Sequence, residues 1–458
     1  MIIVKILLGL LGLGIVVFVH ELGHFLAARL VGIEVEAFSI GWGKPFLRKK
    51  LGAVEYRLGV FPLGGYCKMK GENEFREAWE NRQNQVEPVP GSFFAARPWR
   101  RIIVSFAGPF FNLVFAALVL SCIWGIGFTI TTPENRIVLA SEVDRGERYP
   151  ADDAGLATGD RVISINGKSI STYQEIQQEI ALHPEEPLAL VVERDGQTLP
   201  LSTTPALDKS SGAGRIGVYY WAEPVVDEVL PEGPAALAGL ESGDLIRAVN
   251  GEEVPYTAAL IPLLKRGNDA PEPPAPLPIV YERAGQLRET AIVPRYDEAG
   301  NADLGLGWKL TAVRSPRYSL PGALAKGAAE TGRFFAVSLK GLGLLFRGVD
   351  LTKAVSGPVR ITYMVGDAAA AGFGRSAGTG FGVLANFLAL ISISLCIMNL
   401  LPLPILDGGM ILLFLIEMLI RRPLHPRFIA VFQTAGIVLI AALMLFALFG
   451  DILYLSQG

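Results

Sequence analysis

The sequence predicts a polytopic α-helical membrane protein with four transmembrane helices and two inserted β-rich domains. Three observations predict this fold class. Hydrophobic residues make up 51% of the 458 residues and the mean hydropathy is +0.39, which together favour a membrane protein over a soluble enzyme. Four segments are apolar enough and long enough to cross a bilayer. Between the second and third of these segments lies a long polar stretch that contains an internal repeat.

The four predicted spans are not alike. Residues 102–132, 376–406 and 428–450 contain no Asp, Glu, Lys or Arg, and each reaches spanning length. The first span, residues 1–30, is interrupted by His20, Glu21, His24 and Arg29. Its start is weakly basic, it has no small-residue cleavage site, and its apolar run exceeds that of a signal peptide. We therefore expect it to be a retained helix.

The loops between the spans predict the orientation. Lys and Arg outnumber Asp and Glu in residues 31–101, between the first two spans. Arg421, Arg422 and Arg427 crowd the short loop before the last span. The positive-inside rule places both of these loops in the cytoplasm. The long segment between the second and third spans, and both termini, are then expected on the outside.

Charge and cysteine content argue against two other classes of protein. A net charge of −3 and a pI near 6.0 give no reason to expect a nucleic-acid partner. Cys67, Cys122 and Cys396 lie far apart in the chain and form no CxxC pair. A disulfide framework or a structural zinc ribbon is therefore not expected.

The outer segment carries a repeat of about the size of a small domain. Residues 154–167 (AGLATGDRVISING) align with residues 238–251 (AGLESGDLIRAVNG) at an offset of 84 residues. In each copy a glycine ends a helix, an alternating strand follows, and an Asn-Gly pair predicts a hairpin turn. The pattern AGLxxGD with this strand and turn resembles the PDZ domain family, whose members bind extended peptides at a sheet edge. Peptide ends or outer domains of a partner are therefore possible ligands; spacer or shielding modules are the alternative.

These observations divide the chain into nine segments. Within the amphipathic connector 308–375, residues 319–347 are amphipathic enough to lie against the membrane surface or the domains. The predicted order is a first span at 1–30, a cytoplasmic loop at 31–101, a second span at 102–132, PDZ modules at 133–213 and 214–307, a connector at 308–375, a third span at 376–406, an LDGG segment with a short cytoplasmic helix or loop at 407–427, and a fourth span at 428–452.

The ionisable residues of the first span form an HExxH motif. On a helix, His20 and His24 lie on one face about one turn apart, so both imidazoles can reach one zinc ion, with Glu21 beside it. Ionisable groups in a membrane span cost several kcal/mol each, which favours a functional role. Hydrogen bonding between helices is the alternative, but it requires neither the glutamate nor this spacing.

A catalytic zinc site usually has three protein ligands, so a third ligand must come from elsewhere in the chain. Asp407 is the best candidate, because it follows a span that Pro402 and Pro404 interrupt. A broken helix at membrane depth is tolerated only where it lines a buried or watery cavity. The alternative interpretation is that Asp407 caps the helix that follows it.

These motifs together resemble the site-2 protease family of intramembrane zinc metalloproteases, over nearly the whole chain. The matching segments are HELGH at 20–24, GWGK at 41–44, PLGGYCKM at 62–69, AGPFFN at 107–112, SGP at 356–358 and NLLPLPILDGG at 399–409. The resemblance implies a protease of the bacterial inner membrane that acts in regulated intramembrane proteolysis and stress responses. Its implied substrates are single-span membrane proteins: anti-sigma factors already trimmed outside, and remnant signal peptides. The resemblance also implies that the protein is embedded in the lipid bilayer, with the PDZ modules and both termini in the periplasm.

The resemblance also assigns roles to residues. It implies that His20, His24 and Asp407 bind one Zn²⁺ per chain, and that Glu21 is the general base. Asn399 matches an asparagine linked to the substrate or the transition state, and a hydrogen bond between helices is its alternative. Asn112 is expected to bond a neighbour or the substrate. The resemblance also implies a membrane re-entrant β-element in the glycine-flanked run 64–70. Its edge strand would pair with an extended substrate through the residues Gly65, Tyr66, Cys67 and Lys68. An ordinary interfacial hairpin is the alternative.

A membrane-anchored PDZ receptor or scaffold without catalytic activity is the alternative function. An anchor needs neither an HExxH motif nor a proline-broken span that ends in LDGG, so the protease interpretation accounts for more of the sequence. A metal transporter would need polar groups along more of the spans than this sequence has.

Overall fold

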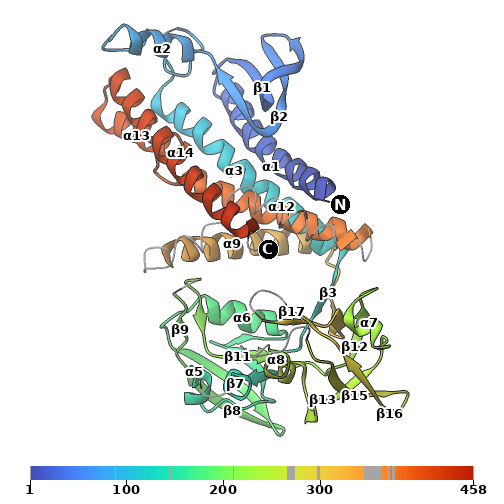
Figure 1. The fold of residues 1–458 in the computed structure, drawn as a ribbon. Coiled ribbons are helices and arrows are strands. Elements are labelled where there is room, and N and C mark those ends of the chain that lie inside the picture. Colours follow the sequence, from blue (N-terminus) through green and yellow to red (C-terminus); the bar gives the residue numbers. More distant parts are fainter. Residues whose placement is uncertain are drawn as a thin grey trace. The chain divides into compact units, whose positions relative to one another are not determined.

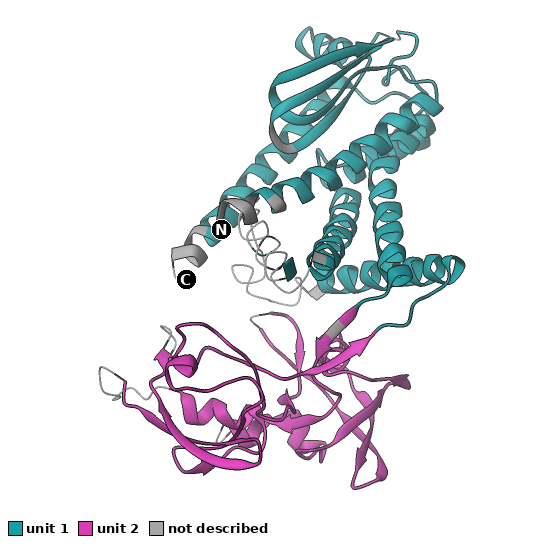
Figure 2. Ribbon diagram, turned by 90° about the vertical axis from the view of Figure 1, so that its right-hand side faces the viewer, with its two compact units in different colours: residues 1–128, 315–458 teal, residues 129–314 magenta. Residues whose placement is uncertain are grey.

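The computed structural model describes residues 2–87, 89–144, 147–209, 211–265, 274–296, 300–344 and 377–456, with the single residues 364, 366, 368, 372 and 373. The SGP motif and much of the expected connector lie outside the described residues. The chain forms two compact units, residues 1–128 with 315–458 and residues 129–314, which Figure 2 shows in separate colours. Each unit is described below by itself.

Unit 1 is helical, and four of its described helices are long and apolar enough to cross a membrane. They are α1 (Ile2–Leu30), α3 (Pro98–Ile126), α12 (Ala377–Leu400) and α14 (Pro426–Ser456). Four spans were predicted, and two of them end earlier than expected. Helix α3 ends before Gly127, whose φ of 77° favours glycine, and α12 ends before the prolines at 402 and 404.

Helix α3 lies at the centre of unit 1, because α1, α12, α13 (Asp407–Ile420) and α9 (Leu320–Leu344) all pack against it. Figure 1 shows α9 running across α3. Gly327 of α9 lies directly against Ser121 of α3, where a larger side chain would collide. The expected amphipathic segment after residue 308 is therefore a helix that braces α3. The apolar contact between α3 and α12 is formed by Ala116, Leu120, Ala389, Ile393 and Ile397.

The loop after α1 forms a twisted hairpin of two long strands, β1 (Val35–Leu51) and β2 (Val54–Met69), followed by α2 (Glu72–Glu80). Each strand bends back on the other: residues 35–40 of β1 pair both with residues 65–69 and with residues 55–58 of β2. Residues 65–69 therefore form an outer edge of this small sheet, and β2 packs against α1. Phe25, Phe38, Phe93 and Phe414 join the hairpin to the helices in one apolar core.

Unit 2 contains two β-rich modules built alike. The first has the sheet order β6-β5-β7-β8 and the second β14-β13-β15-β16, all antiparallel, so the sequence repeat is a structural repeat. Strands β3 (Thr129–Thr132) and β20 (Thr311–Arg314) pair with each other, so the chain enters and leaves unit 2 side by side.

The bounds of the remaining elements complete unit 2. The first module has β4 (Ile137–Leu139), α4 (Ala140–Val143), α5 (Pro150–Asp153), β5 (Arg161–Ile165), β6 (Lys168–Ser169), α6 (Tyr173–Ala181), β7 (Leu188–Arg194), β8 (Gln197–Thr203), β9 (Ala206–Leu207), β10 (Gly214–Arg215) and β11 (Val218–Tyr220). The second has β12 (Val226–Val229), α7 (Pro234–Leu237), β13 (Leu245–Val249), β14 (Glu252–Glu253), η1 (Thr257–Ala259), α8 (Leu260–Leu264), β15 (Leu277–Arg283), β16 (Gln286–Ile292), β17 (Arg295–Tyr296), β18 (Ala302–Asp303) and β19 (Leu306–Trp308).

The boundary between the modules lies later than the sequence predicts. A boundary was expected between residues 213 and 214, but β11 pairs with β4, and Ile216 and Val218 pack in the first module's core. The first module therefore continues through Tyr220. The prediction was wrong because the repeat marks only the helix, strand and turn in the middle of each module, and not the strand that closes it.

The repeated aspartates hold equivalent positions in the two modules. Asp160 accepts two hydrogen bonds from Arg194, and Asp244 accepts two from Arg283, all at 2.6–2.7 Å. Burial by itself would raise the pKa of Asp244, but the hydrogen bonds from Arg283 and from the backbone N–H of Glu241 lower it. The Asp of each AGLxxGD motif is thus a structural residue that ties a turn to a strand.

Candidate metal centre

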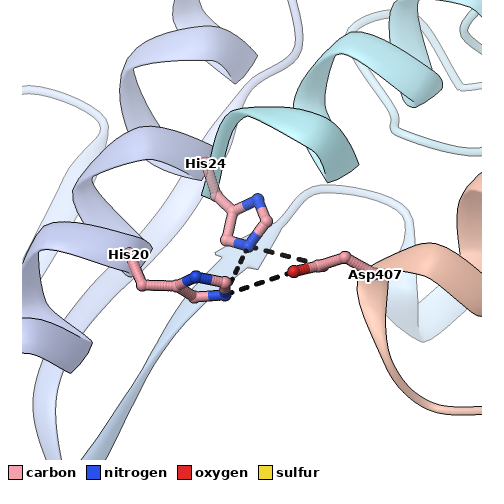
Figure 3. Close-up of side chains that lie close together, drawn as sticks. All are labelled: His20, His24 and Asp407. Atoms are coloured by element: carbon pink, nitrogen blue, oxygen red, sulfur yellow. Dashed lines mark hydrogen bonds and ion pairs between the residues drawn. The ribbon is translucent and has the colours of Figure 1, made fainter. Parts of the chain in front are cut away.

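Three side chains from the two ends of the chain meet in unit 1. His20 and His24 lie one turn apart on α1, and Asp407 reaches them from the first residue of α13 (Figure 3). The Nε2 atoms of the two histidines are 3.1 Å apart. Asp407 Oδ2 lies 3.2 Å from Nε2 of His20, and Oδ1 lies 3.5 Å from Nε2 of His24. One ligand atom from each residue therefore faces a common point.

These separations fit a zinc ion. Ligands at about 2.0–2.2 Å from zinc in tetrahedral geometry lie about 3.3–3.6 Å from one another. Among the described residues, this is the group of His, Cys, Asp and Glu side chains close enough to hold a metal ion. Two imidazoles and one carboxylate are the ligand set of known catalytic zinc sites, which leave a fourth position open.

The glycines after Asp407 explain why this carboxylate can reach the histidines. A Cβ atom at Gly408 would lie 2.3 Å from the carbonyl oxygen of Leu400, and one at Gly409 would lie 2.1 Å from that of Leu403. Helix α13 can therefore begin directly against the broken end of α12 only if both positions are glycine. The first residue of α13 is Asp407 itself, and the N-cap, Leu406, makes no side-chain cap bond. The capping interpretation of Asp407 is thus not supported by the geometry.

Helix α3 forms the wall behind the two imidazoles. A Cβ atom at Gly108 would lie 2.4 Å from Nε2 of His24 and 2.9 Å from Cε1 of His20, so only glycine leaves room for both rings. Gly23 of α1 similarly lies against the carbonyl of Ala107. His24 donates from Nδ1 to the carbonyl oxygen of Val104 at 2.8 Å. Because a carbonyl can only accept, the proton of this ring is on Nδ1 and Nε2 is free for a metal.

Glu21 lies beside the three residues, on the side that faces β2. Its carboxylate interacts electrostatically with His20, His24 and Asp407 and accepts a hydrogen bond from the backbone N–H of Cys67. A Cβ atom at Gly65 would lie 3.1 Å from Cγ of Glu21. The edge segment of β2 thus approaches the centre through its backbone, at a position where a side chain would displace Glu21.

The other predicted site residues differ in whether they contact the metal centre. Tyr66 and Lys68 point away from Glu21, because alternate residues of a strand face opposite sides. The hydroxyl of Tyr66 accepts from Arg57, and Lys68 pairs with Glu36. Asn112 lies against His20, with Nδ2 3.4 Å from Nδ1 of the imidazole. Asn399 is half-buried in the last turn of α12, eight residues before Asp407.

Comparison with known proteins identifies the family. The model of the family described as Peptidase family M50 matches residues 8–443. The chain belongs to peptidase family M50. A Treponema pallidum protein named "Putative zinc metalloprotease" is 40% identical over 452 residues, which cover 99% of each chain. The Haemophilus influenzae regulator of sigma E protease is 30% identical over 466 residues, covering 97% of this chain and 98% of the relative.

The M50 assignment confirms the predicted resemblance, the enzyme class and the metal. The protein is a multi-pass membrane zinc metalloprotease with four candidate spans. Among solved structures, a PDZ domain of an SdrC-like protein from Listeria monocytogenes covers 20% of this chain and 93% of its own. Its sequence is 21% identical and its TM-score is 0.16.

Sequence reasoning missed several residues that shape the centre of this M50 peptidase. Gly108 was noted only as part of the AGPFFN match, and the roles of Gly23 and Val104 were not predicted. An AGP triplet inside an apolar span was the available indication, since glycine in a helix is costly unless something packs closely against it. Ser392 of α12, which donates to the backbone oxygen of Asn112 at 2.8 Å, gave no sequence indication.

Proposed function

We propose that this M50 peptidase cleaves single-span membrane proteins within the bilayer, with His20, His24 and Asp407 as zinc ligands and Glu21 as general base. The observation that carries the proposal is the position of the centre. It is formed by α1, at the C-terminal side of a membrane span, by α3, a second span, and by α13, which follows directly on a third. The bond to be cut would therefore reach the centre from within the membrane.

The residues present supply the parts that peptide hydrolysis needs. A bound zinc would lower the pKa of a water molecule and polarise the carbonyl of the scissile bond. Glu21 would accept the proton of the attacking water and deliver it to the departing amine. Asn399, near the broken end of α12, carries an amide that would donate a hydrogen bond to the developing oxyanion. The histidines pack against Gly108 of α3, and Glu21 lies against Gly65 of β2.

The substrate would bind in extended form along the edge of β2. A helical segment has its backbone bonded internally, so it must unwind before a peptide bond is accessible. Residues 65–69 form a sheet edge beside Glu21, and their backbone is the part nearest to it. Gly65 and Cys67 would then contact the substrate through backbone groups, while Tyr66 and Lys68 support the strand from its other side.

The orientation proposed for the chain follows from its loops. Residues 31–101 and 421–427 would be cytoplasmic by the positive-inside rule, and unit 2 and both termini would then lie in the periplasm of a bacterial inner membrane. The proposed substrates are those that the sequence resemblance implies, an anti-sigma factor already trimmed outside and remnant signal peptides. The name of the related regulator of sigma E protease is in keeping with a role in sigma-factor regulation. The trimmed outer end of such a substrate would meet the modules of unit 2.

Removing the modules of unit 2 is expected to permit cleavage of substrates with intact outer domains, if the modules limit access. Thr132 pairs with Thr311, so deleting residues 133–310 and joining these threonines by a short turn leaves the entry strands paired. Cleavage of trimmed and untrimmed forms of one substrate is compared by gel. The same deletion with Glu21→Gln controls for other proteases, and unchanged preference for the trimmed form would contradict the role in access.

Replacing a ligand is expected to remove the metal. Purified protein should hold about one zinc per chain, and Asp407→Ala should lower zinc binding by orders of magnitude, because two histidines remain where three ligands are usual. Metal analysis after gel filtration measures this. His183→Ala is the matched control, since its Nδ1 bonds the Glu179 carbonyl in unit 2. Full zinc content in Asp407→Ala would refute the proposed ligand set.

A further inference from the structure

Asn112 is a fully buried polar residue, and of its two side-chain amide atoms only the nitrogen has a hydrogen-bond partner among the described residues. It lies on α3, one turn after Gly108, and 0% of its surface is exposed. Its Nδ2 atom is 3.4 Å from Nδ1 of His20, while its Oδ1 atom is buried and has no hydrogen-bond partner among the described residues. Ser392 holds the backbone oxygen of the same residue, so this turn of α3 is fixed in place.

The amide orientation is linked to the proton on the ring of His20. When the N–H of Asn112 faces Nδ1, that ring nitrogen must accept, so the ring proton is on Nε2, 3.2 Å from Asp407 Oδ2. A metal ligand needs the opposite tautomer, with a free Nε2 and a proton on Nδ1. A half-turn of the amide puts Oδ1 where Nδ2 lies, and Oδ1 is the acceptor that such an Nδ1 proton requires.

We propose that Asn112 is a positioning residue for His20, accepting the Nδ1 proton through Oδ1 and so directing Nε2 to the metal. The inference rests on the proposed ligand set. Both histidines would then donate an Nδ1 proton to an acceptor on α3, since Val104 already accepts the Nδ1 proton of His24 at 2.8 Å. Helix α3 thus offers an acceptor to each ring, one turn before and one turn after Gly108, the residue against which both rings pack.

Zinc affinity of the full-length protein in detergent, measured by competition with a chelator, tests the proposal without relying on activity. Asn112→Leu removes the acceptor and keeps the side-chain size, and its zinc affinity should fall about 10–100-fold. Asn112→Asp keeps an oxygen acceptor and should stay within about threefold of the original protein or bind more tightly. A residue that only packs predicts the reverse order, because leucine suits a buried apolar site and a carboxylate does not.

Two controls separate the possible failures. Ser121→Ala removes a hydroxyl hydrogen bond elsewhere on α3, to the carbonyl oxygen of Ala117, and its zinc affinity should not change. His20→Ala tests the ligand set itself. If His20→Ala loses zinc but Asn112→Leu binds like the original protein, the role of Asn112 is refuted and the ligand set stands. If His20→Ala also binds normally, the proposed ligand set fails.

Discussion

Glu21→Gln is expected to lower the rate of substrate cleavage by about 10²–10⁴-fold, the usual contribution of a general base. Glutamine keeps the size of the side chain and its bond from the Cys67 backbone N–H, but its amide cannot accept the proton of the attacking water. Glu21 is not one of the three proposed ligands, so the zinc content should remain about one per chain. The measurement is cleavage of a model transmembrane substrate, with metal analysis of the same sample.

Glu72→Gln is the matched control for this substitution. Glu72 begins α2, after the β-hairpin, and like Glu21 it accepts a hydrogen bond from a backbone N–H of β2, that of Met69, but it is absent from the metal centre. Its activity should stay close to that of the original protein. Cleavage by Glu21→Gln at more than a tenth of the original rate, with zinc bound, would refute the general-base role.

Glu417→Ala is expected to reduce the free energy of unfolding by about 3–5 kcal/mol, because it leaves a buried arginine without its counter-charge. Nη2 of Arg101 donates to Oε1 of Glu417 at 2.5 Å, and the two side chains are only 4% and 8% exposed. The guanidinium also lies 4.6 Å from the ring centroid of Phe414. Unfolding in mixed detergent micelles, followed by tryptophan fluorescence, gives the change in free energy.

Removing both charges tests whether the loss comes from the unpaired arginine. Arg101→Met with Glu417→Leu should recover most of the stability, since replacing a buried ion pair with apolar groups is often neutral or stabilising. Because the pair joins α3 to α13, the helix that begins at Asp407, the single variant should also bind zinc more weakly. A double variant as unstable as the single one would show that packing, and not the buried charge, accounts for the effect.

Much of the fold was predictable because the bilayer imposes simple rules. Long runs without charge, such as residues 102–126, have few alternatives to a membrane helix, and four were found. The HExxH spacing predicted that His20 and His24 share a face of α1. The need for a third zinc ligand, together with the proline-interrupted end of the third span, then led to Asp407, and the structure places these three residues together.

What the sequence could not predict concerns pairs that are distant in the chain. Arg101 was counted among the loop charges that set the orientation, yet it is buried against Glu417, 316 residues away. Gly108 has no side chain to suggest a function, and its importance appears only when two imidazoles occupy the space beside it. The ends of two helices were also predicted too late, because the sequence stays apolar past Ile126 and Leu400 whereas the helices end at these residues.

The division of the metal centre between α1 and α13 has a consequence for synthesis of the protein. His20, Glu21 and His24 leave the ribosome first, and Asp407 follows almost 400 residues later. At about 5–20 residues per second, the first half of the centre waits about 20–80 s for the second. A nascent chain in the membrane thus has two of the proposed ligands and the proposed base but no complete site. Proteolytic competence comes only after Asp407 has been synthesised.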